Sequence, residues 1–523
     1  MTCTHFSLAP SIGLVLALGA CGDSGNTSDT SASASTSAST GASNSTDPTS
    51  TTVPTTSGAS ETATGGQTTT GNSASGTTSG GESSTGPGTS ATSSSTDPTA
   101  TTGGSSGQIS ASGTTTGDTT TGGDTTGVGE TTSTSTTGQP CEPGDTNGMG
   151  DVEKSYLWVA NTDEGSVSKV NTLSLIEEAR YFSELTQTGV SSPSRTSVNI
   201  TGRFVVVSNR GTGWVTKVAA NKDDCIDKNG NGTIETSTDK DTLLPWGADE
   251  CQLWSTQVTA NVFSVGAGPR GTTWTPGTFN KETCKFEDQK VWVGWLVGPG
   301  QAMMGRLDGE TGMLEATVPL PDWPLTADAT NGYAPYGAAT DASGYIWTSA
   351  VFADKVWRID PVTLEVKVWA GGNGDSHYGM TTDGKGRVWF ANWSGHGGVS
   401  MFDPATETFA VVPGSEGNVF RGVAAGADGN VWVANNGGAL GCGLIQISAD
   451  TMTVVTFHQF EQCGTPVGVS IDVAGKVWMV DFNGWAYKMD PETYAKELIT
   501  IANQHYTYSD MTGGGLLNAI MPG

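Results

Sequence analysis

From residue 155 onward, short apolar runs alternate with turns rich in Gly, Asp, Asn and Pro. One run recurs, in which an apolar or aromatic residue is usually followed by Trp and then by apolar and small residues. Its seven copies are Tyr156–Asn161, Phe204–Asn209, Val291–Gly294, Tyr345–Ser349, Val388–Asn392, Val431–Asn435 and Val477–Asp481. Each copy has the length and composition of a buried β-strand.

Each run belongs to a larger repeat. A Gly-containing strand with an Asp-Gly turn precedes it, as in Tyr378–Gly384. A third strand follows, as in Lys355–Asp360, and a turn of Asp-Pro type leads to a fourth, as in Glu365–Trp369. The Trp residues of the last four copies are 42, 43 and 46 residues apart. Four short strands in such a unit are typical of a propeller blade, so we predict an all-β, seven-bladed β-propeller over residues 141–523. The alternative, a pair of β-sandwiches, does not explain the steady period.

Two features of the repeat need separate explanations. The 86 residues from Val206 to Trp292 leave space for an eighth blade, but residues 222–250 are acidic and loop-like, so we expect one blade with an insertion. The first blade lacks the Gly-containing strand, and Tyr508–Gly513 resembles Tyr378–Asp383. We therefore predict that a C-terminal strand takes the innermost position of blade one, where it pairs edges that an open ring would expose.

Residues 22–140 contain no Lys, Arg, Cys or aromatic residue and consist mainly of Ser, Thr and Gly. Such a segment buries too little apolar surface to offset the entropy of ordering it, so we predict a disordered tether over residues 21–140. The formal net charge is −28, and nine acids lie in the tether, which leaves −19 for the rest of the chain. A surface this acidic repels nucleic acid.

The N-terminus contains a short apolar run, Ile12–Ala20, that fits the core of a signal peptide over residues 1–20. Leu18-Gly19-Ala20-Cys21 resembles the bacterial lipobox. That resemblance implies that Cys21 becomes the first residue, carries acyl chains and anchors the exported chain to a membrane, either the outer membrane or the cell surface. The alternative is an ordinary signal peptide with an incidental Cys, because the segment before the apolar run has His5 but no Lys or Arg.

Residues 227–235 match the opening of a calcium-binding loop, in which oxygen-bearing side chains alternate and Gly232 permits the bend. The candidate ligands of a structural calcium ion are Asp227, Asn229, Asn231, Thr233 and Glu235. The twelfth position holds Thr238 where a bidentate Glu is usual, so Glu235, Asp239 or Asp241 would have to replace it. The alternative is an acidic, glycine-rich surface loop without metal.

Besides Cys3 and Cys21, six cysteines remain, and an even number in an exported protein suggests disulfides. Of the 15 possible pairings, we favour Cys225–Cys251, at the base of the acidic insertion, and Cys442–Cys463, within one blade. Cys141–Cys284 is the pair that remains. The sequence contains no CxxC spacing that would indicate redox or metal chemistry.

The units Tyr378–Thr408 and Arg421–Thr451 resemble those of the streptogramin B (virginiamycin B) lyase-like propellers and, more loosely, NHL repeats. The resemblance implies the propeller fold and, for a lyase, a metal with a His/Glu/His set. The positions that match the first His hold Arg270, Tyr336, Tyr378, Arg421 and Val467. His377 lies one residue early, and Asn392-Trp393-Ser394 stands where Glu-x-His is expected, so the catalytic set is missing.

Our leading hypothesis is a non-catalytic binding or scaffold module on the cell surface. The starts of the inner strands would line the mouth of the axial channel, and the candidate residues there are Arg195, Arg270, Tyr336, Tyr378 and Arg421, with His377 beside them. A cationic, aromatic mouth suits an anionic small molecule, a glycan or an acidic loop of a protein. Alternatively, these residues only pack the blades together. The second hypothesis is a lyase or hydrolase with altered catalytic residues.

Overall fold

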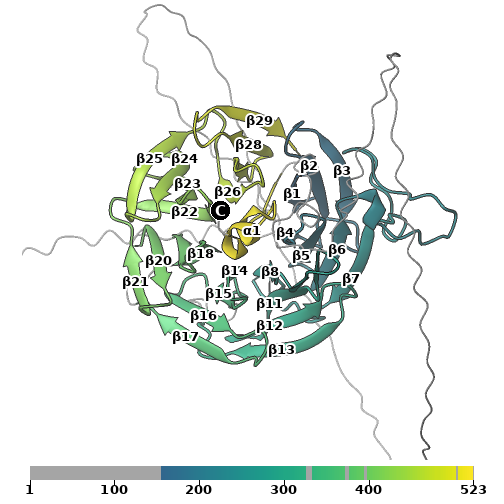
Figure 1. Ribbon diagram of the computed structural model, residues 1–523, viewed down its shortest axis with the longest axis horizontal. Coiled ribbons are helices and arrows are strands. Elements are labelled where there is room, and N and C mark those ends of the chain that lie inside the picture. The colour runs from purple at the N-terminus through teal and green to yellow at the C-terminus, as the bar shows by residue number, and fades with distance from the viewer. Residues whose placement is uncertain are drawn as a thin grey trace, which may run out of the picture. The chain divides into compact units, whose positions relative to one another are not determined.

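The computed structural model describes residues 155–264, 266–325, 332–371, 376–393, 397–501 and 504–521. These residues form seven antiparallel sheets of three or four strands, arranged as blades around an axis (Figure 1). The predicted seven-bladed, all-β propeller is therefore confirmed. The predicted signal peptide, Cys21 and the tether lie outside the described residues.

In each complete blade the strands follow one another from the axis outward. Blade one contains β1 (Tyr156–Asn161), β2 (Ser166–Asn171) and β3 (Glu177–Phe182). Blade two contains β4 (Pro193–Val198), β5 (Phe204–Asn209), β6 (Trp214–Ala219) and β7 (Gln252–Gln257). Blade three contains β8 (Thr272–Trp274), β11 (Lys290–Gly298), β12 (Gln301–Asp308) and β13 (Leu314–Leu320). Blade four contains β14 (Gly337–Thr340), β15 (Ile346–Ser349), β16 (Lys355–Ile359) and β17 (Val366–Ala370).

The last three blades repeat this order without insertions. Blade five contains β18 (His377–Thr382), β19 (Val388–Asn392), β20 (Val399–Asp403) and β21 (Thr408–Val411). Blade six contains β22 (Asn418–Ala425), β23 (Asn430–Gly438), β24 (Cys442–Ser448) and β25 (Thr453–Gln459). Blade seven contains β26 (Pro466–Ile471), β27 (Val477–Asp481), β28 (Trp485–Met489) and β29 (Lys496–Thr500).

The recurrent Trp strand is the second position of each blade and is buried on both faces, which explains its unbroken apolar run. Its side chains join neighbouring blades: Trp389 of blade five belongs to one buried cluster with Val423 and Val433 of blade six. The outermost strands have one solvated face, and β17 accordingly contains only half-buried and exposed residues. The core is therefore a series of apolar layers between blades.

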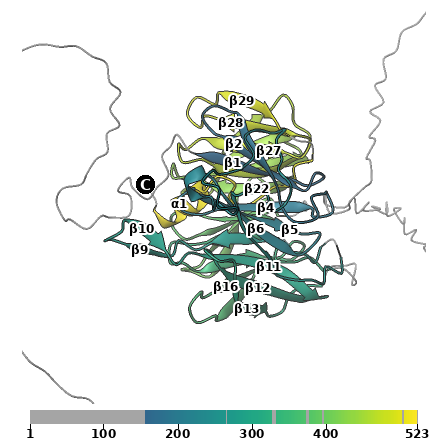
Figure 2. The same ribbon diagram turned by 90° about the vertical axis from the view of Figure 1, so that its right-hand side faces the viewer.

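The long gap in the repeat contains an insertion, as predicted, and no eighth blade. Residues 220–251 join β6 to β7 and contain only the short 3-10 helix η2 (Lys222–Asp224). A second insertion was not predicted: a hairpin of β9 (Thr278–Asn280) and β10 (Lys285–Glu287) interrupts blade three between β8 and β11. Figure 2 shows this hairpin projecting on the side of the ring where α1 (Gly514–Ile520) lies.

The C-terminal segment closes the ring next to blade one, as predicted, although it pairs through isolated bridges and not through a continuous ladder. Trp158 N donates to Met511 O at 3.0 Å, and Val198 N donates to Asp510 O at 3.1 Å, so the segment lies between β1 and β4. Only isolated bridges form, such as Arg195–Tyr508. Ser509 adopts a φ of 71°, which interrupts the extended conformation that a continuous ladder requires.

The unpredicted helix α1 follows the closing segment and lies at the centre of the ring in Figure 1. Its Asn518 donates to the carbonyl of Ala425, the last residue of inner strand β22, at 3.3 Å. The helix therefore covers the end of the axis at which the inner strands finish. No helix among the described residues is long and apolar enough to cross a membrane.

Candidate functional site

The inner strands begin at the end of the axis opposite α1, and the predicted mouth residues lie there. Arg195, Tyr378 and Arg421 belong to β4, β18 and β22, while Arg270 and Tyr336 shortly precede β8 and β14. The structure brings these five side chains together. The rings of Tyr336 and Tyr378 are 4.8 Å apart, Arg270 lies 5.2 Å from the ring of Tyr336, and Arg421 lies 5.3 Å from that of Tyr378.

Two tyrosines of the closing segment complete this cluster, which we call the axial cluster. The hydroxyl of Tyr506 contacts that of Tyr336 and lies 2.7 Å from that of Tyr378. The hydroxyl of Tyr378 also contacts that of Tyr508. Four phenols therefore form one hydrogen-bonded chain across the axis. The sequence contained a signal for Tyr508, because this residue matches Tyr378 in the repeat, but that match was used only to predict closure.

The guanidinium groups are held by aromatic rings and by neutral oxygens. Arg195 lies 3.9 Å from the centre of the Tyr508 ring and donates to the carbonyl of Tyr336 at 3.3 Å. Arg421 donates to the hydroxyl of Tyr378 at 3.0 Å and lies 4.2 Å from the ring of Trp393. Such cation–π contacts favour a positive charge at these positions.

The axial cluster is buried instead of lining an open mouth. Arg195 is 1% exposed, Arg421 is 6% exposed, and Tyr336 and Tyr378 are equally inaccessible. Half-buried Trp393 packs over Tyr378, with the rings stacked 5.3 Å apart. The side chains therefore fill the axis themselves, so their packing role is evident from the structure, and a ligand would meet Trp393 before it meets Arg421.

The positive charge of Arg195 and Arg421 is not balanced inside the cluster. Neither residue forms an ion pair with an acidic side chain of the described ranges, and the Nε of Arg421 is buried without a hydrogen-bond acceptor. Burial raises the pKa of Tyr508 well above 10, so this phenol remains neutral. Two buried cations thus face a neutral aromatic environment.

His377, the sixth candidate, is not part of the axial cluster. It precedes Tyr378 in β18, and successive side chains of a strand point to opposite sides. Its buried ring stacks on Phe390 at 3.9 Å, and its Nε2 lies 3.4 Å from a carboxylate oxygen of Asp354. We therefore correct the sequence-based placement: His377 packs within its own blade and against blade four, and not at the axis.

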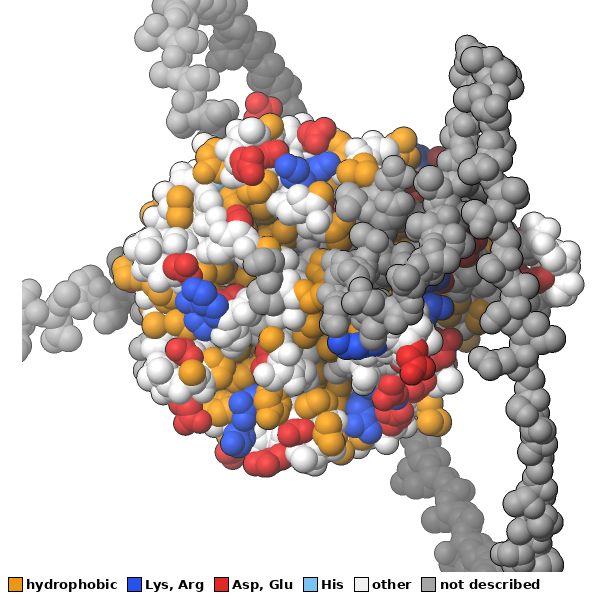
Figure 3. Space-filling model, viewed as in Figure 1, with side chains coloured by type: hydrophobic (Ala, Val, Ile, Leu, Met, Phe, Trp, Pro, Cys, Tyr) orange, Lys and Arg blue, Asp and Glu red, His pale blue; other side chains and the backbone are white. Residues whose placement is uncertain are grey.

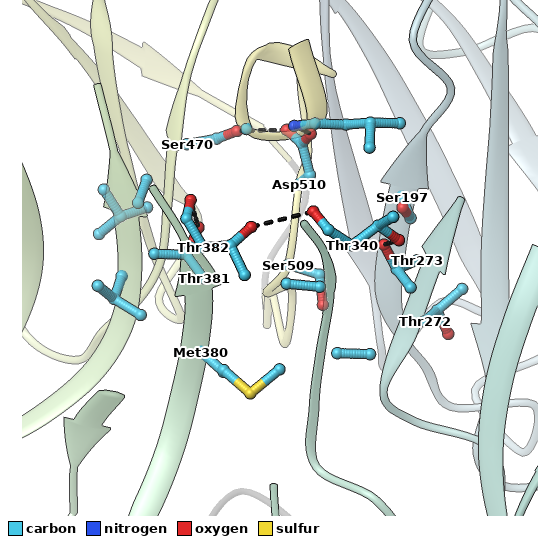
Figure 4. Close-up of a pocket in the computed structure, with 17 residues that line it drawn as sticks. Ser197, Thr272, Thr273, Thr340, Met380, Thr381, Thr382, Ser470, Ser509 and Asp510 are labelled. Atoms are coloured by element: carbon cyan, nitrogen blue, oxygen red, sulfur yellow. Dashed lines mark hydrogen bonds between the residues drawn. The ribbon is translucent and has the colours of Figure 1, made fainter. Parts of the chain in front are cut away.

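A small cavity lies between the inner strands and the start of α1 (Figure 4). Its volume is about 30 Å³, enough for on the order of two water molecules. Hydroxyl groups and apolar side chains of the inner strands line it together. Among them, Thr382 donates to the carbonyl of Thr340 at 3.0 Å. At its far end, the buried carboxylate of Asp510 accepts hydrogen bonds from Leu516 N at 2.8 Å and Gly513 N at 2.9 Å. Asp510 thereby holds the start of α1 and closes the channel.

The face around α1 differs from the axial cluster. Figure 3 views this face and shows acidic and basic side chains interspersed over the described surface. Many of them form ion pairs, such as Lys290 with Asp308 at 2.8 Å and Arg387 with Asp383 at 2.7 Å. The arginines of the axial cluster, in contrast, lie among tyrosines, which is why we place the candidate site at the other end.

The predicted calcium loop has its own compact geometry. The carboxylate of Asp227 accepts hydrogen bonds from the backbone N–H groups of Gly230 at 2.6 Å and Gly232 at 2.8 Å. The carboxylate of Glu235 accepts from the side-chain amides of Asn229 and Asn231, both at 2.8 Å. These bonds, first that of Gly232 for Asp227 and that of Asn231 for Glu235, lower the pKa of both carboxyl groups. Hydrogen bonds therefore join all five candidate residues in one loop, and Thr233 takes part through its N–H, which donates to Asn231 Oδ1 at 2.7 Å. Calcium binding stays a prediction.

Two predicted disulfides are confirmed. Cys225–Cys251 closes the acidic insertion with a Cα–Cα distance of 4.4 Å, and Cys442–Cys463 lies at 5.8 Å. Cys284 is also disulfide-bonded. Cys141, its predicted partner, lies outside the described residues, so that pairing stays a prediction.

No protein-family model and no curated protein matches the sequence. Solved structures do match. The virginiamycin B lyase of Staphylococcus aureus is 13% identical, with a TM-score of 0.41 over 62% of this chain and 93% of that one. A streptogramin B lyase is 15% identical, with a TM-score of 0.42 over 64% and 89%. AztD of Citrobacter koseri is 11% identical, with a TM-score of 0.44 over 67% and 96%. The chain is thus similar in fold, and in fold alone, to streptogramin B lyase-like propellers.

Proposed function

We propose that this chain is a non-catalytic binding propeller, anchored at the cell surface by lipid on Cys21, that recognises an anionic ligand at the axial cluster. The observation that carries this proposal is the burial of Arg195 and Arg421 without a carboxylate partner among the described residues. Burying an ion costs several kcal/mol unless an opposite charge compensates for it. A chain that keeps two such groups in one buried cluster gains stability when an anion binds.

The chemistry of arginine narrows the kind of ligand. A guanidinium presents N–H groups in a flat fork that matches a carboxylate, a sulfate or a phosphate. In Arg421 one N–H donates to Tyr378, while Nε has no acceptor within the part of the chain that the structure describes. An anion that bound this edge would form charge-assisted hydrogen bonds in a site with little water, where such bonds are strongest.

A lyase or hydrolase activity, the second hypothesis, has less support. Acid–base catalysis with an electrophilic ion needs a base and metal ligands beside the substrate. The axial positions that the family resemblance assigns to catalysis hold arginine and tyrosine, and His377 faces away from them. These residues suit binding and orientation of an anion better than proton transfer.

The proposal is tested by isothermal titration calorimetry of the full chain with succinate and sulfate. We expect both anions to bind, and Arg421→Gln to weaken binding at least tenfold. Arg358→Gln is the matched control, because Arg358 also lies 4.3 Å from a tyrosine ring, that of Tyr345, but belongs to β16. Absence of binding, or equal binding by both variants, overturns the proposal.

The anchor is tested separately. Cells that express the chain with radioactive palmitate should label it, and Cys21→Ser should abolish the label and release the protein from the membrane fraction. Labelling that survives Cys21→Ser would contradict an anchor at this residue.

A further inference from the structure

Aromatic side chains surround the way into the axial cluster. Trp393, which directly follows β19, is half-buried and lies over Arg421, 4.2 Å from its guanidinium. On the side of blade four, the ring of Tyr333 lies 6.1 Å from Tyr336 and 5.6 Å from Phe352. A series of rings therefore runs from the buried phenols to the surface, where Phe352 is 37% exposed.

The backbone of Phe352 is unusual for such a residue. Its φ of 63° lies in the left-handed region that bulky side chains rarely adopt. A hydrogen bond from Phe352 N to Ser376 Oγ at 3.2 Å, between blades four and five, holds this conformation. Strained residues of this kind persist where the surroundings fix them and often mark ligand sites. Phe352 is thus held with its ring at the solvent boundary beside the axial cluster.

We propose that the ligand is an acidic saccharide, whose carboxylate binds Arg421 and whose sugar ring stacks on Trp393. This inference rests on the proposed function and names its ligand class. A pyranose ring presents a flat face of C–H groups to an aromatic ring, while its hydroxyls exchange hydrogen bonds with phenols such as Tyr378 and Tyr508. Indole and phenol side chains combine an apolar face with a polar edge, which matches both halves of this ligand.

The charge of the chain further limits the ligand. The part of the chain beyond the tether carries a formal charge of −19, so the chain as a whole repels a long polyanion. One uronate unit brings a single negative charge and one ring. The arrangement of one half-buried indole over one buried guanidinium fits such a unit.

Trp393 must move for this ligand to bind, because the Nε of Arg421 is buried beneath it. Its indole is therefore both the cover of the anion site and the platform for the sugar ring. Removing it should uncover Arg421 for a small anion and at the same time remove the stacking surface. The substitution should therefore change the affinities for a small anion and for a saccharide in different ways, and an experiment can measure both.

The test compares four probes by calorimetry on the full chain: D-galacturonate, its methyl ester, succinate and tetraglutamate. We expect galacturonate to bind at least tenfold more tightly than succinate or the uncharged ester. Trp393→Ala should weaken galacturonate binding at least tenfold but should leave succinate binding unchanged or make it tighter. Trp393→Phe, which keeps a ring, should restore most of the loss, and this rescue shows that folding is intact.

Trp369→Ala is the matched control, because Trp369 stacks on Trp347 at 5.7 Å in outer strand β17 and should leave both affinities unchanged. Equal affinity for succinate and galacturonate, or tighter binding of tetraglutamate, overturns the saccharide but leaves an anion-binding function. Failure of all the charged probes to bind overturns the anion-binding function itself.

Discussion

The indole Nε1 of Trp389 donates a hydrogen bond to Oδ2 of Asp383 at 2.8 Å, six residues earlier in the chain. The other carboxylate oxygen accepts the backbone N–H groups of Lys385 and Arg387, both at 3.0 Å. Blades four and seven repeat this arrangement through the pairs Asp341–Trp347 and Asp472–Trp478. One aspartate thus shapes the turn between the first two strands and accepts the hydrogen bond of the buried indole N–H.

We predict that Asp383→Ala lowers the free energy of unfolding by about 1–3 kcal/mol, because it leaves the buried N–H of Trp389 without an acceptor and removes the partner of Arg387. Urea denaturation measures this change. Asp403→Ala is the matched control: Asp403 accepts one hydrogen bond from Ala405 N at 2.8 Å in a more exposed turn, and its loss should cost less than about 1 kcal/mol. Equal losses in both variants would show that the pairing with Trp389 contributes nothing.

The fold could be predicted because the chain repeats one pattern of a buried apolar strand seven times. Burial on both faces requires an unbroken apolar run in every Trp strand, and such runs stand out in sequence. The hairpin of β9 and β10 escaped prediction because its strands have three residues each and only one ring contact, Phe279 with Phe286 at 5.0 Å. The sequence did not predict helix α1, because the helix begins with two glycines and its first turn depends on a hydrogen bond to Asp510.

The residues of the axial cluster could be predicted, but not their burial. Every inner strand begins near the axis, so the side chains at those positions must converge. Whether they leave an opening at the axis depends on residues from other parts of the chain. Here Tyr506 and Tyr508 of the closing segment occupy that space. The repeat does not encode this filling, because the closing segment is not a regular strand.

The cost of the buried cation gives a second prediction. In the absence of ligand, Arg421→Met should raise the free energy of unfolding by about 1 kcal/mol, because it removes a buried charge that has no counter-ion among the described residues. Arg387→Met is the contrasting variant, since Arg387 pairs with Asp383 at 2.7 Å and should lose stability. Urea denaturation measures the change in unfolding free energy of both variants. A loss of stability in Arg421→Met would mean that the cluster itself compensates for the charge.

The loop at residues 227–235 allows a third prediction. If calcium is bound there, thermal unfolding of the chain should shift upward by several degrees on addition of calcium chloride and downward with a chelator, because a ligand that binds only the folded state stabilises it. Asp227→Ala should abolish the shift, since its carboxylate is the central acceptor of the loop. Asp360→Ala, in an exposed turn of blade four, should keep it. A chelator without effect on the wild-type chain would contradict calcium binding.

The fourth prediction concerns acid. Burial, and to a smaller extent Lys496, lowers the pKa of His458 to about 4. The ring of His458 packs 5.4 Å from Trp432 and 4.5 Å from Tyr494, and its Nε2 lies 3.3 Å from Gln446 Oε1. Because the folded-state pKa lies below the ordinary value of about 6.5, the unfolded chain takes up a proton first as the pH falls. The contribution of His458 to stability is therefore complete above pH 6.5 and is lost progressively between about pH 6.5 and pH 4.

This acid dependence can be isolated with one variant. His458→Gln keeps a polar group opposite Gln446 but cannot be protonated in this range. We expect the difference in unfolding free energy between wild type and His458→Gln to be constant above pH 6.5 and to shift in favour of the variant as the pH approaches 4. Urea denaturation at half-unit pH intervals measures it, and the buried aspartates titrate alike in both proteins, so they cancel. A difference that does not change with pH would mean that His458 titrates normally and that its surroundings admit the charged ring.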